Sequence, residues 1–250
     1  MKITQERFKD RIVLITGAAS GIGLSTALLM GAEGGTMVLA DLNPEKLAQA
    51  ENLVLKAGAP QVWGSVCDVS KQDQVRATVA GTIERFKRLD VIVNNAGLMI
   101  FKALQDHTEE DWLKVLSVDL LGAFFFIREA FLHMSPGGSI VNVSSIHAVE
   151  TTPLVSSYAA AKAALLSLTR SAAIECKPKG IRVNAVLPGA IETPMLWENP
   201  NIKAGLEIIR HEDVGKPEDI ASSIAFLASY QAEFVQGTSL RIDGGRLARL

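Results

Sequence analysis

A tyrosine and a lysine four residues apart form the part of this sequence best suited to proton chemistry. The segment reads Tyr158-Ala159-Ala160-Ala161-Lys162 and lies in a stretch of helical period, so the phenol and the ammonium share one helix face. A phenol with a pKa near 10 is a poor base at neutral pH, but a neighbouring positive charge lowers that pKa. In a partly desolvated cleft the pair could move a proton, whereas on an exposed helix it would be an ordinary pair of neighbours.

The elements that must position this pair alternate along the chain. Short apolar runs predict strands, and longer segments of helical period lie between them. Most of the runs are apolar at every residue, which is typical of strands covered on both faces. The pattern predicts an α/β fold, a doubly wound parallel sheet of about seven strands with helices on both faces. The predicted strands are 12–16, 36–40, 62–66, 91–94, 139–144, 182–187 and 239–242, and the predicted helices lie near 21–34, 44–57, 71–88, 109–134, 154–177 and 217–229.

The chain length of 250 residues fits a single domain spanning residues 1–250. Residues 189–215 interrupt the regular pattern, because they are rich in Pro, Asn and charge and contain one weak helical patch. Ligands of such a sheet bind beyond the carboxyl ends of its strands. An irregular segment that follows a strand there is expected to be a variable substrate lid.

The overall composition narrows the class of protein. A net charge of −2 and a sequence pI near 6.1 argue against a nucleic-acid-binding protein. The two cysteines, Cys67 and Cys176, lie far apart, so neither a disulfide framework nor a metal site is expected and a cytoplasmic location is the default. The longest apolar stretch, 120–127, is too short to span a bilayer, so no membrane association is expected.

A glycine-rich turn follows the first predicted strand. Residues 16–23 read Thr-Gly-Ala-Ala-Ser-Gly-Ile-Gly and lead directly into a helix. Glycines let the backbone approach a pyrophosphate, and the helix N-terminus offers N–H groups and a positive dipole to it. Glycine also serves tight turns that bind nothing, but the strand–turn–helix context is the one that a dinucleotide site requires.

An aspartate ends the second predicted strand. Asp41 lies eighteen residues after Gly23, where a carboxylate can accept hydrogen bonds from both ribose hydroxyls and would repel a 2′-phosphate. No Arg or Lys lies in the glycine turn or beside Asp41, and Lys46 is the nearest cation downstream. The sequence therefore predicts NAD(H) in preference to NADP(H).

Taken together and in order, these segments resemble the short-chain dehydrogenase/reductase family over nearly the whole chain. The glycine turn matches the TGxxxGxG pattern of that family, and Ser145, Tyr158 and Lys162 match its serine and YxxxK residues. The further matches are Asn94-Asn95-Ala96-Gly97, Asp68, Pro188-Gly189 with Thr193, residues 215–221, and Asp243-Gly244-Gly245.

The resemblance implies a Rossmann-type fold and transfer of a hydride between NAD(H) and a secondary alcohol or ketone. Tyr158 would be the general acid/base, Lys162 would tune it, and Ser145 would hydrogen-bond the substrate oxygen, with substrate contacts from Ser145, His147 and Tyr158. The helices 109–134 and 154–177 are apolar on more than one face, and the family resemblance implies a homotetramer. The implied cofactor-binding residues are Gly17, Ser20, Gly21, Ile22, Gly23, Asp41, Leu42, Cys67, Asp68, Val69, Asn95, Ala96, Gly97, Tyr158, Lys162, Pro188, Gly189, Ile191 and Thr193.

One position departs from the family pattern. The family has asparagine in a V-N-x-x-G stretch that helps to hold a water of a proton relay, and this chain has Asp119 in the segment 118–122. An ionised Asp119 close to Lys162 would keep the lysine charged and partly offset its effect on Tyr158. We expect activity to persist with a shifted pH dependence, which makes Asp119 a further candidate catalytic residue.

The substrate itself is not specified by the sequence. Apolar residues next to the motifs predict a largely apolar pocket with one or two polar contacts, and His147 could either contact the substrate or point into solvent. A dinucleotide sensor without catalysis is the alternative function, and a nucleotide-dependent transferase such as a methyltransferase is a second one that leaves the Tyr/Lys pair unexplained. The predicted pocket residues are Leu98, Met99, His147, Val149, Leu154, Met195 and Trp197.

Overall fold

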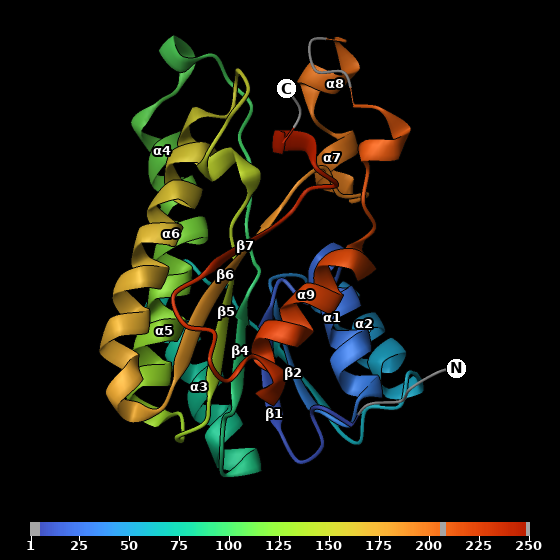
Figure 1. Ribbon diagram of the computed structural model, residues 1–250, viewed down its shortest axis with the longest axis vertical. Coiled ribbons are helices and arrows are strands. Elements are labelled where there is room, and N and C mark those ends of the chain that lie inside the picture. Colours follow the sequence, from blue (N-terminus) through green and yellow to red (C-terminus); the bar gives the residue numbers. More distant parts are fainter. Residues whose placement is uncertain (1–5, 206–208, 249–250) are drawn as a thin grey trace.

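The strands of the protein form one parallel sheet. The computed structural model describes residues 6–205 and 209–248, and its seven strands have the order β3-β2-β1-β4-β5-β6-β7 (Figure 1). This confirms the doubly wound sheet predicted from the sequence. The order reverses between β1 and β4, and such a switch point is where ligands of this fold class bind. The strands are β1 (Ile12–Thr16), β2 (Thr36–Asp41), β3 (Val62–Val66), β4 (Val91–Asn94), β5 (Ser139–Val143), β6 (Arg182–Pro188) and β7 (Ser239–Ile242).

Burial along the strands follows their position in the sheet. Every residue of the central strands β1, β4 and β5 is buried, because helices cover both faces of the sheet there. The edge strands β3 and β7 are partly exposed. The uniformly apolar sequence of the central strands is therefore a consequence of two-sided burial.

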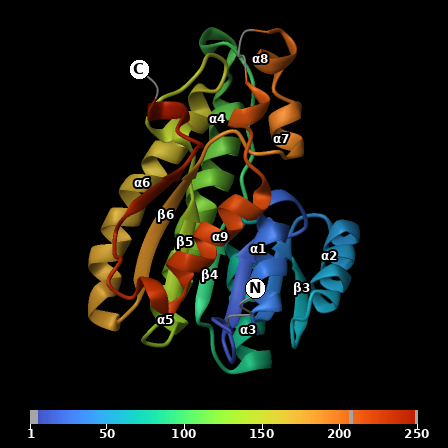
Figure 2. The same ribbon diagram turned by 45° about the vertical axis from the view of Figure 1, so that its right-hand side comes forward.

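Two helical layers sandwich the sheet, and each buries its own hydrophobic core. On one face, residues of β1 and β2 pack with helices α1 (Gly21–Ala32), α2 (Pro44–Lys56) and α9 (Pro217–Ala228). On the other face, the sheet packs with α3 (Gln72–Phe86), α5 (Gly122–His133) and α6 (Ser156–Cys176). Figures 1 and 2 show the two layers on opposite sides of the strands.

The structure corrects the prediction of one continuous helix over residues 109–134. Helix α4 (Glu109–Leu116) opens with a capping box between Thr108 and Asp111, but five residues of π-helix, Ser117–Leu121, separate it from α5. A π-helical turn holds an extra residue and changes the direction of the side chains that it carries. This turn carries Asp119, which is fully buried.

The segment predicted as a lid, residues 189–215, leaves the sheet after β6. It contains the short helices α7 (Pro194–Trp197) and α8 (Pro200–Lys203), and Ile191 pairs with Gly215 where the segment returns. Residues 206–208 of the predicted lid lie outside the described residues. Within the described parts of the chain, no helix combines the length and apolar character needed to cross a membrane.

A buried polar chain ties α6 to the middle of the sheet. Asn94 Nδ2 on β4 donates to Asn142 Oδ1 on β5 at 2.8 Å, and Asn142 Nδ2 donates to Thr169 Oγ1 on α6 at 2.8 Å. Thr169 Oγ1 in turn donates to the carbonyl of Leu165 at 2.8 Å. Buried polar groups are costly unless paired, so this chain fixes the position of α6, the helix that carries Tyr158 and Lys162.

We expect Asn142→Ala to reduce the free energy of unfolding by about 2–3 kcal/mol, because the Asn94 amide and the Thr169 hydroxyl lose a buried partner. The measurement is urea denaturation followed by circular dichroism. Asn52→Ala is the matched control, since the Asn52 side chain is exposed and donates within its own helix, to the Ala48 carbonyl. Equal midpoints for the two variants would contradict a structural role of the buried chain.

Candidate active site

A cleft opens at the carboxyl ends of the central strands. It has a volume of about 610 Å³. Its lining comes from residues at or after the ends of all seven strands, from α6 and from the segment 189–215. Because all seven strands are parallel, their carboxyl ends meet at one edge of the sheet. Segments far apart in the sequence therefore face one space.

The glycine turn forms one wall of this cleft. Gly17, Ser20, Gly21 and Ile22 line it, while Gly23 lies behind the turn, where a Cβ would come within 2.2 Å of the Gly17 carbonyl oxygen. Only glycine permits that contact, which lets α1 start directly at the turn. The predicted role of Gly23 is thus packing of the turn, and the other predicted residues of the turn face the cleft.

The end of β2 places a carboxylate beside the same turn. Asp41 Oδ2 accepts a hydrogen bond from the backbone N–H of Ala19 at 3.0 Å, and Oδ1 accepts one from Asn43 N–H at 3.0 Å. Asp41 and its neighbour Leu42 line the cleft, as do Cys67, Asp68 and Val69 after β3. The carboxylate is therefore oriented toward the glycine turn before any ligand binds.

Asn95 joins the turn to the end of β4. Its side-chain Nδ2 donates to the carbonyls of Thr16 and Gly17 at 2.9 and 3.1 Å, and Thr16 Oγ1 accepts from the backbone N–H groups of Asn95 and Ala96, both at 3.0 Å. The segment Asn95–Gly97 lines the cleft. These hydrogen bonds hold the glycine turn after β1 against the segment that follows β4.

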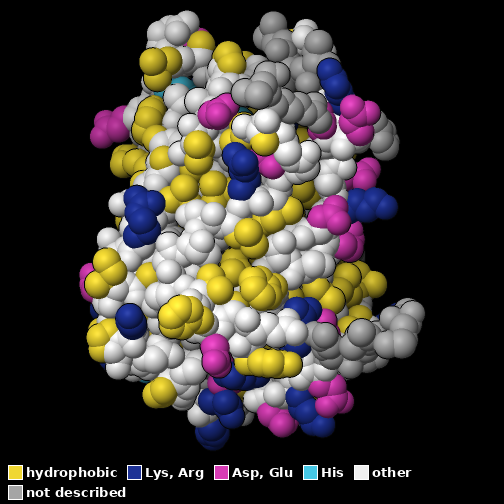
Figure 3. Space-filling view, viewed as in Figure 1, with side chains coloured by type: hydrophobic (Ala, Val, Ile, Leu, Met, Phe, Trp, Pro, Cys, Tyr) yellow, Lys and Arg dark blue, Asp and Glu magenta, His cyan; other side chains and the backbone are white. Residues whose placement is uncertain are grey.

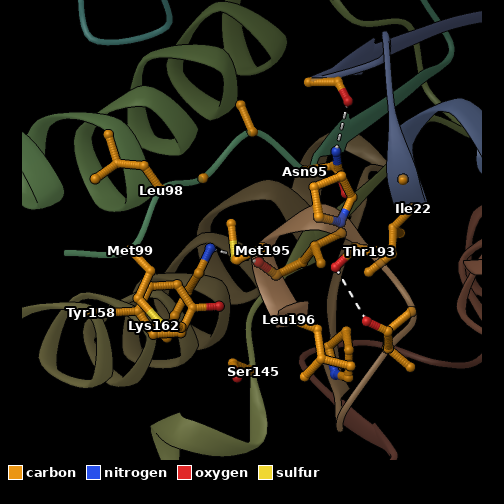
Figure 4. A pocket seen from close by; sticks show the side chains of 18 of the residues that line it. Ile22, Asn95, Leu98, Met99, Ser145, Tyr158, Lys162, Thr193, Met195 and Leu196 are labelled. Atoms are coloured by element: carbon orange, nitrogen blue, oxygen red, sulfur yellow. Dashed lines mark hydrogen bonds between the residues drawn. The ribbon is translucent and has the colours of Figure 1, made fainter. Parts of the chain in front are cut away.

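Ser145, Tyr158 and Lys162 meet in the same cleft. Ser145 follows β5, and Tyr158 and Lys162 lie in the first turns of α6. All three are more than nine-tenths buried and line the cleft. Figure 4 shows them together, with Leu98 and Met99 on one side and Thr193 and Leu196 on the other.

Lys162 is held from two directions. Its Nζ donates to the carbonyl of Val143 at the end of β5 at 3.1 Å, and it lies 5.5 Å from the centre of the Tyr158 ring. Ser144 Oγ donates to the backbone carbonyl of Lys162 at 2.9 Å. The strand β5 thus fixes both the side chain and the backbone of the lysine.

Asp119 lies behind Lys162 rather than in the lining of the cleft. Asp119 Oδ1 is 3.1 Å from Lys162 Nζ, an ion pair without good hydrogen-bond alignment, and Oδ2 accepts from the backbone N–H of Leu98 at 3.1 Å. A Cβ on Gly97 would lie 2.6 Å from Oδ1, so glycine is needed for the carboxylate to come this close. The sequence analysis considered the case of an ionised Asp119 close to Lys162, and the two side chains are close in the structure.

The charges of these buried groups oppose one another. Burial raises the pKa of Tyr158 above its ordinary value of 10; the charge of Lys162 acts to lower it, and the charge of Asp119 acts to raise it. Burial acts to lower the pKa of Lys162, but the charge of Asp119 opposes this effect and the net shift of the pKa is upward, so the lysine stays charged. In the ligand-free protein Tyr158 is therefore a protonated phenol at neutral pH.

Several predictions about the substrate end need correction. Leu98, Met99, His147 and Met195 line the cleft, and the His147 ring contacts Tyr158 edge-on with centroids 6.0 Å apart, so this histidine faces the site. Val149 and Trp197 are absent from the lining and lie exposed at the surface. Leu154 is also absent from the lining; its carbonyl accepts from the Lys102 N–H.

Other residues of the lining were missed by sequence reasoning. Most come from the irregular segments on either side of the substrate end, where no periodic pattern reveals which side chains turn inward. Arg246 had one usable signal, because it directly follows the Asp243-Gly244-Gly245 turn at the carboxyl end of β7. The missed residues are Phe101, Val118, Val143, Ser144, Ile146, Ala190, Pro194, Leu196, Glu198, Asn199 and Arg246.

The order of the strands and the position of the cleft assign the protein to the Rossmann-type class of nucleotide-binding folds. Residues 17–246 match the sequence model of a family described as enoyl-(acyl carrier protein) reductase. The chain therefore belongs to the short-chain dehydrogenase/reductase family and is an oxidoreductase.

Relatives with assigned activities match the chain over nearly its whole length. A 3-oxoacyl-[acyl-carrier-protein] reductase of Thermotoga maritima is 40% identical over 245 residues, which cover 96% of this chain and 98% of the relative. A cis-4-hydroxycyclohexanecarboxylate dehydrogenase of Sinomonas cyclohexanicum is 40% identical over 250 residues, covering 97% and 99%.

Solved structures agree with this assignment. The crystal structure of levodione reductase superposes with a TM-score of 0.88 at 37% identity and covers 98% of this chain and 100% of that one. Carveol dehydrogenase from Mycobacterium avium, solved in complex with NAD, gives a TM-score of 0.90 at 28% identity and covers 97% and 99%.

We expect Asp119→Ala to lower the free energy of unfolding by about 3–5 kcal/mol, because it leaves the buried Lys162 ammonium without its counter-charge. Asp73→Ala is the control, since the Asp73 side chain is 96% exposed. Thermal and urea denaturation at pH 7 measure both. If Asp119→Ala lowered the free energy of unfolding no more than Asp73→Ala does, the ion pair would not be needed to hold Lys162.

Proposed function

We propose that the protein is an NAD(H)-dependent oxidoreductase that transfers a hydride between nicotinamide and a secondary alcohol or ketone, with Tyr158 as general acid/base. The observation that carries this proposal is the convergence of Ser145, Tyr158 and Lys162 on a cleft whose other end is the glycine turn. Under this proposal the residues that move the proton and the residues that bind the dinucleotide line the same cleft.

The residues at the glycine turn fit a dinucleotide. The glycine turn places backbone without bulky side chains at the start of α1. The N-cap residue Ser20 makes no side-chain hydrogen bond to this helix, so the N–H groups of its first turn are suited to binding a pyrophosphate. Asp41 would hold the adenosine ribose, and Leu42 and Asn43, its neighbours in sequence, carry no positive charge for a 2′-phosphate. The remaining cofactor contacts proposed from the sequence line the same cleft, Gly23 excepted. We therefore favour NAD(H) over NADP(H).

Bound nicotinamide would supply or accept the hydride, and the protein's own groups would handle the proton. In the reductive direction the Tyr158 phenol, protonated at neutral pH, donates its proton to the oxygen of the ketone as negative charge develops there. Ser145 hydrogen-bonds that oxygen and positions it. In the oxidative direction Tyr158 accepts the proton, and the Lys162 ammonium stabilises the phenolate.

The relatives support a secondary alcohol or ketone as substrate. One of them acts on a hydroxycyclohexanecarboxylate, and the solved neighbours include a levodione reductase and a carveol dehydrogenase. The apolar side chains at the substrate end, including Leu98, Met99 and Phe101, suit a compact carbon skeleton of this kind.

A catalytically silent dinucleotide sensor is the alternative function. It would give no reason for a buried lysine, held by a carboxylate and a strand carbonyl, to lie beside a buried tyrosine. A protein that binds NADH and turns over no member of a broad panel of alcohols and ketones would support the sensor. A nucleotide-dependent transferase would instead fail to bind NADH.

A homotetramer in the cytoplasm remains a prediction. Large apolar side chains are exposed on α5 and α6, among them Phe124 and Ile174, and beyond α9, where Phe234 is fully exposed. Hydrophobic side chains also gather across the middle of the face in Figure 3, where α9 and β7 lie in Figure 1. Such surfaces are suited to contacts between subunits.

The test of the proposed function is Tyr158→Phe. Wild-type protein should reduce cyclic ketones with NADH faster than with NADPH, and the variant should lose about 10²–10⁴-fold in kcat because the proton donor is gone. Tyr230→Phe, which changes the only other tyrosine, is the control; its side chain is exposed. NADH binding measured by fluorescence should be retained in both variants.

Full activity of Tyr158→Phe would contradict the role of this residue. A preference for NADPH would contradict the role of Asp41 while leaving the reaction class intact.

The charge of Asp119 should set the pH dependence of the reaction. Removing it in Asp119→Asn should lower the pKa of Tyr158, because a nearby negative charge opposes the phenolate. Oxidation requires the phenolate, so its rate rises with pH through that pKa, and we expect this limb to move down by about 1 pH unit. Superimposable pH–rate profiles for the wild type and the variant would contradict the electrostatic role.

A further inference from the structure

The lid contains a buried amide that does not line the cleft. Asn201 on α8 is 1% exposed, the lowest value among the buried polar residues of the described lid. Its side-chain Nδ2 donates to the carbonyl of Pro153 at 2.9 Å, and its backbone N–H donates to Oδ1 of Asn199, a lining residue of the cleft, at 2.9 Å. This side chain therefore links the lid to the part of the chain just before α6.

Stability alone does not explain an amide at this position. Asn201 Oδ1 is buried and has no hydrogen-bond partner within the described parts of the chain, and an unpaired buried acceptor reduces the free energy of unfolding. A leucine side chain has nearly the same shape and would leave no such acceptor. What the amide adds is the hydrogen bond from Nδ2 to Pro153.

The segment that receives this hydrogen bond has an unusual backbone. Leu154 has a φ of +69°, in the left-handed region that is costly for residues other than glycine. The two carbonyls at this bend have partners from different parts of the chain. The Pro153 carbonyl accepts from Asn201, and the Leu154 carbonyl accepts from the backbone N–H of Lys102 at 3.0 Å. These two hydrogen bonds help to hold the bend.

The same bend lies next to the helix that carries the proposed proton donor. Helix α6 begins at Ser156, shortly after the bend, and contains Tyr158 in its first turn. Lys102 directly follows Phe101, which lines the cleft. The bend at residues 153–154 therefore connects the lid, one wall of the cleft and the helix of Tyr158.

The lid also contacts the glycine turn. A Cβ on Gly21 would lie 3.2 Å from Thr193 Cγ2, so the start of α7 packs directly against this turn. Between Thr193 and Asn201, the side chains of Met195 and Leu196 line the cleft (Figure 4). The lid helices are thus attached on both sides of the stretch that faces the cleft.

We propose that Asn201 is a positioning residue that holds α7 and α8 closed over the cleft through its hydrogen bond to Pro153. In this closed position Met195 and Leu196 pack against the bound alcohol or ketone and exclude water from it. The inference rests on the proposed function and adds how the site closes over its substrate. A single hydrogen bond contributes little net free energy, so it can break each time a substrate enters or a product leaves.

Hydrogen–deuterium exchange of the lid tests this contact directly. Asn201→Leu removes the donor and keeps the size of the side chain, so the backbone N–H groups of residues 194–203 should exchange about 3- to 10-fold faster, because the open state is more populated. Peptides from β5 should exchange at the wild-type rate. Asn201→Ala should give the same result, and Asn52→Leu is the control, since it makes the same change on the exposed face of α2.

Steady-state kinetics with NADH and a cyclic ketone test the consequence for the reaction. Both Asn201 variants should raise the KM for the ketone about 3- to 10-fold, because closure of the lid contributes to binding. Their kcat should not fall, since Asn201 takes no part in proton transfer and an opened lid favours product release. The KM for NADH and the melting temperature of Asn201→Leu should stay at the wild-type values.

Several results would overturn the inference. Unchanged exchange of residues 194–203 would show that the hydrogen bond does not hold the lid, and faster exchange with an unchanged KM for the ketone would show that closure does not position the substrate. A fall in kcat and melting temperature at constant KM would indicate a structural role instead. If the wild type reduces no ketone, the proposed function itself fails, which is a distinct result, and the exchange measurement still decides whether Asn201 holds the lid.

Discussion

The buried contact between Asp119 and Lys162 is the interaction on which the candidate site depends. A lysine ammonium cannot be buried alone at neutral pH without a large loss of solvation, and the carboxylate 3.1 Å away offsets that loss. The contact requires a π-helical turn to bring Asp119 inward and a glycine at position 97 to leave it room. With the lysine fixed in this way, the tyrosine one turn earlier on α6 faces a permanent positive charge.

The same pair limits how strongly that charge acts. Burial raises the pKa of Tyr158, and Asp119 adds to this effect while Lys162 opposes it. The ligand-free site is therefore better suited to donating a proton than to accepting one. Proton acceptance needs additional positive charge near the phenol, which oxidised nicotinamide would bring. Under our proposal the direction of proton transfer thus follows the redox state of the bound cofactor.

The parallel arrangement of the strands explains why one cleft can hold both the proposed cofactor-binding residues and the proposed proton-transfer residues. Each strand delivers its following residues to the same edge of the sheet, so the glycine turn after β1, Ser145 after β5 and Arg246 after β7 face one space. The buried chain from Asn94 through Asn142 to Thr169 then holds α6 against those strands. The precision of the site comes from rigid elements, and Met195 and Leu196 of the segment 189–215 add apolar contacts.

The sequence alone determined the strands, most of the helices and the glycine turn at one wall of the cleft, because apolar periodicity and glycine-rich turns depend on local chain geometry. Its motifs also identified Ser145, Tyr158, Lys162 and the departure at Asp119. Tertiary structure decided the rest. A π-helical turn inside the predicted helix 109–134, the exposure of Val149 and Trp197, and the inward position of Arg246 depend on contacts between segments distant in sequence. Periodicity cannot encode such contacts, since which side of an irregular segment is buried depends on what packs against it.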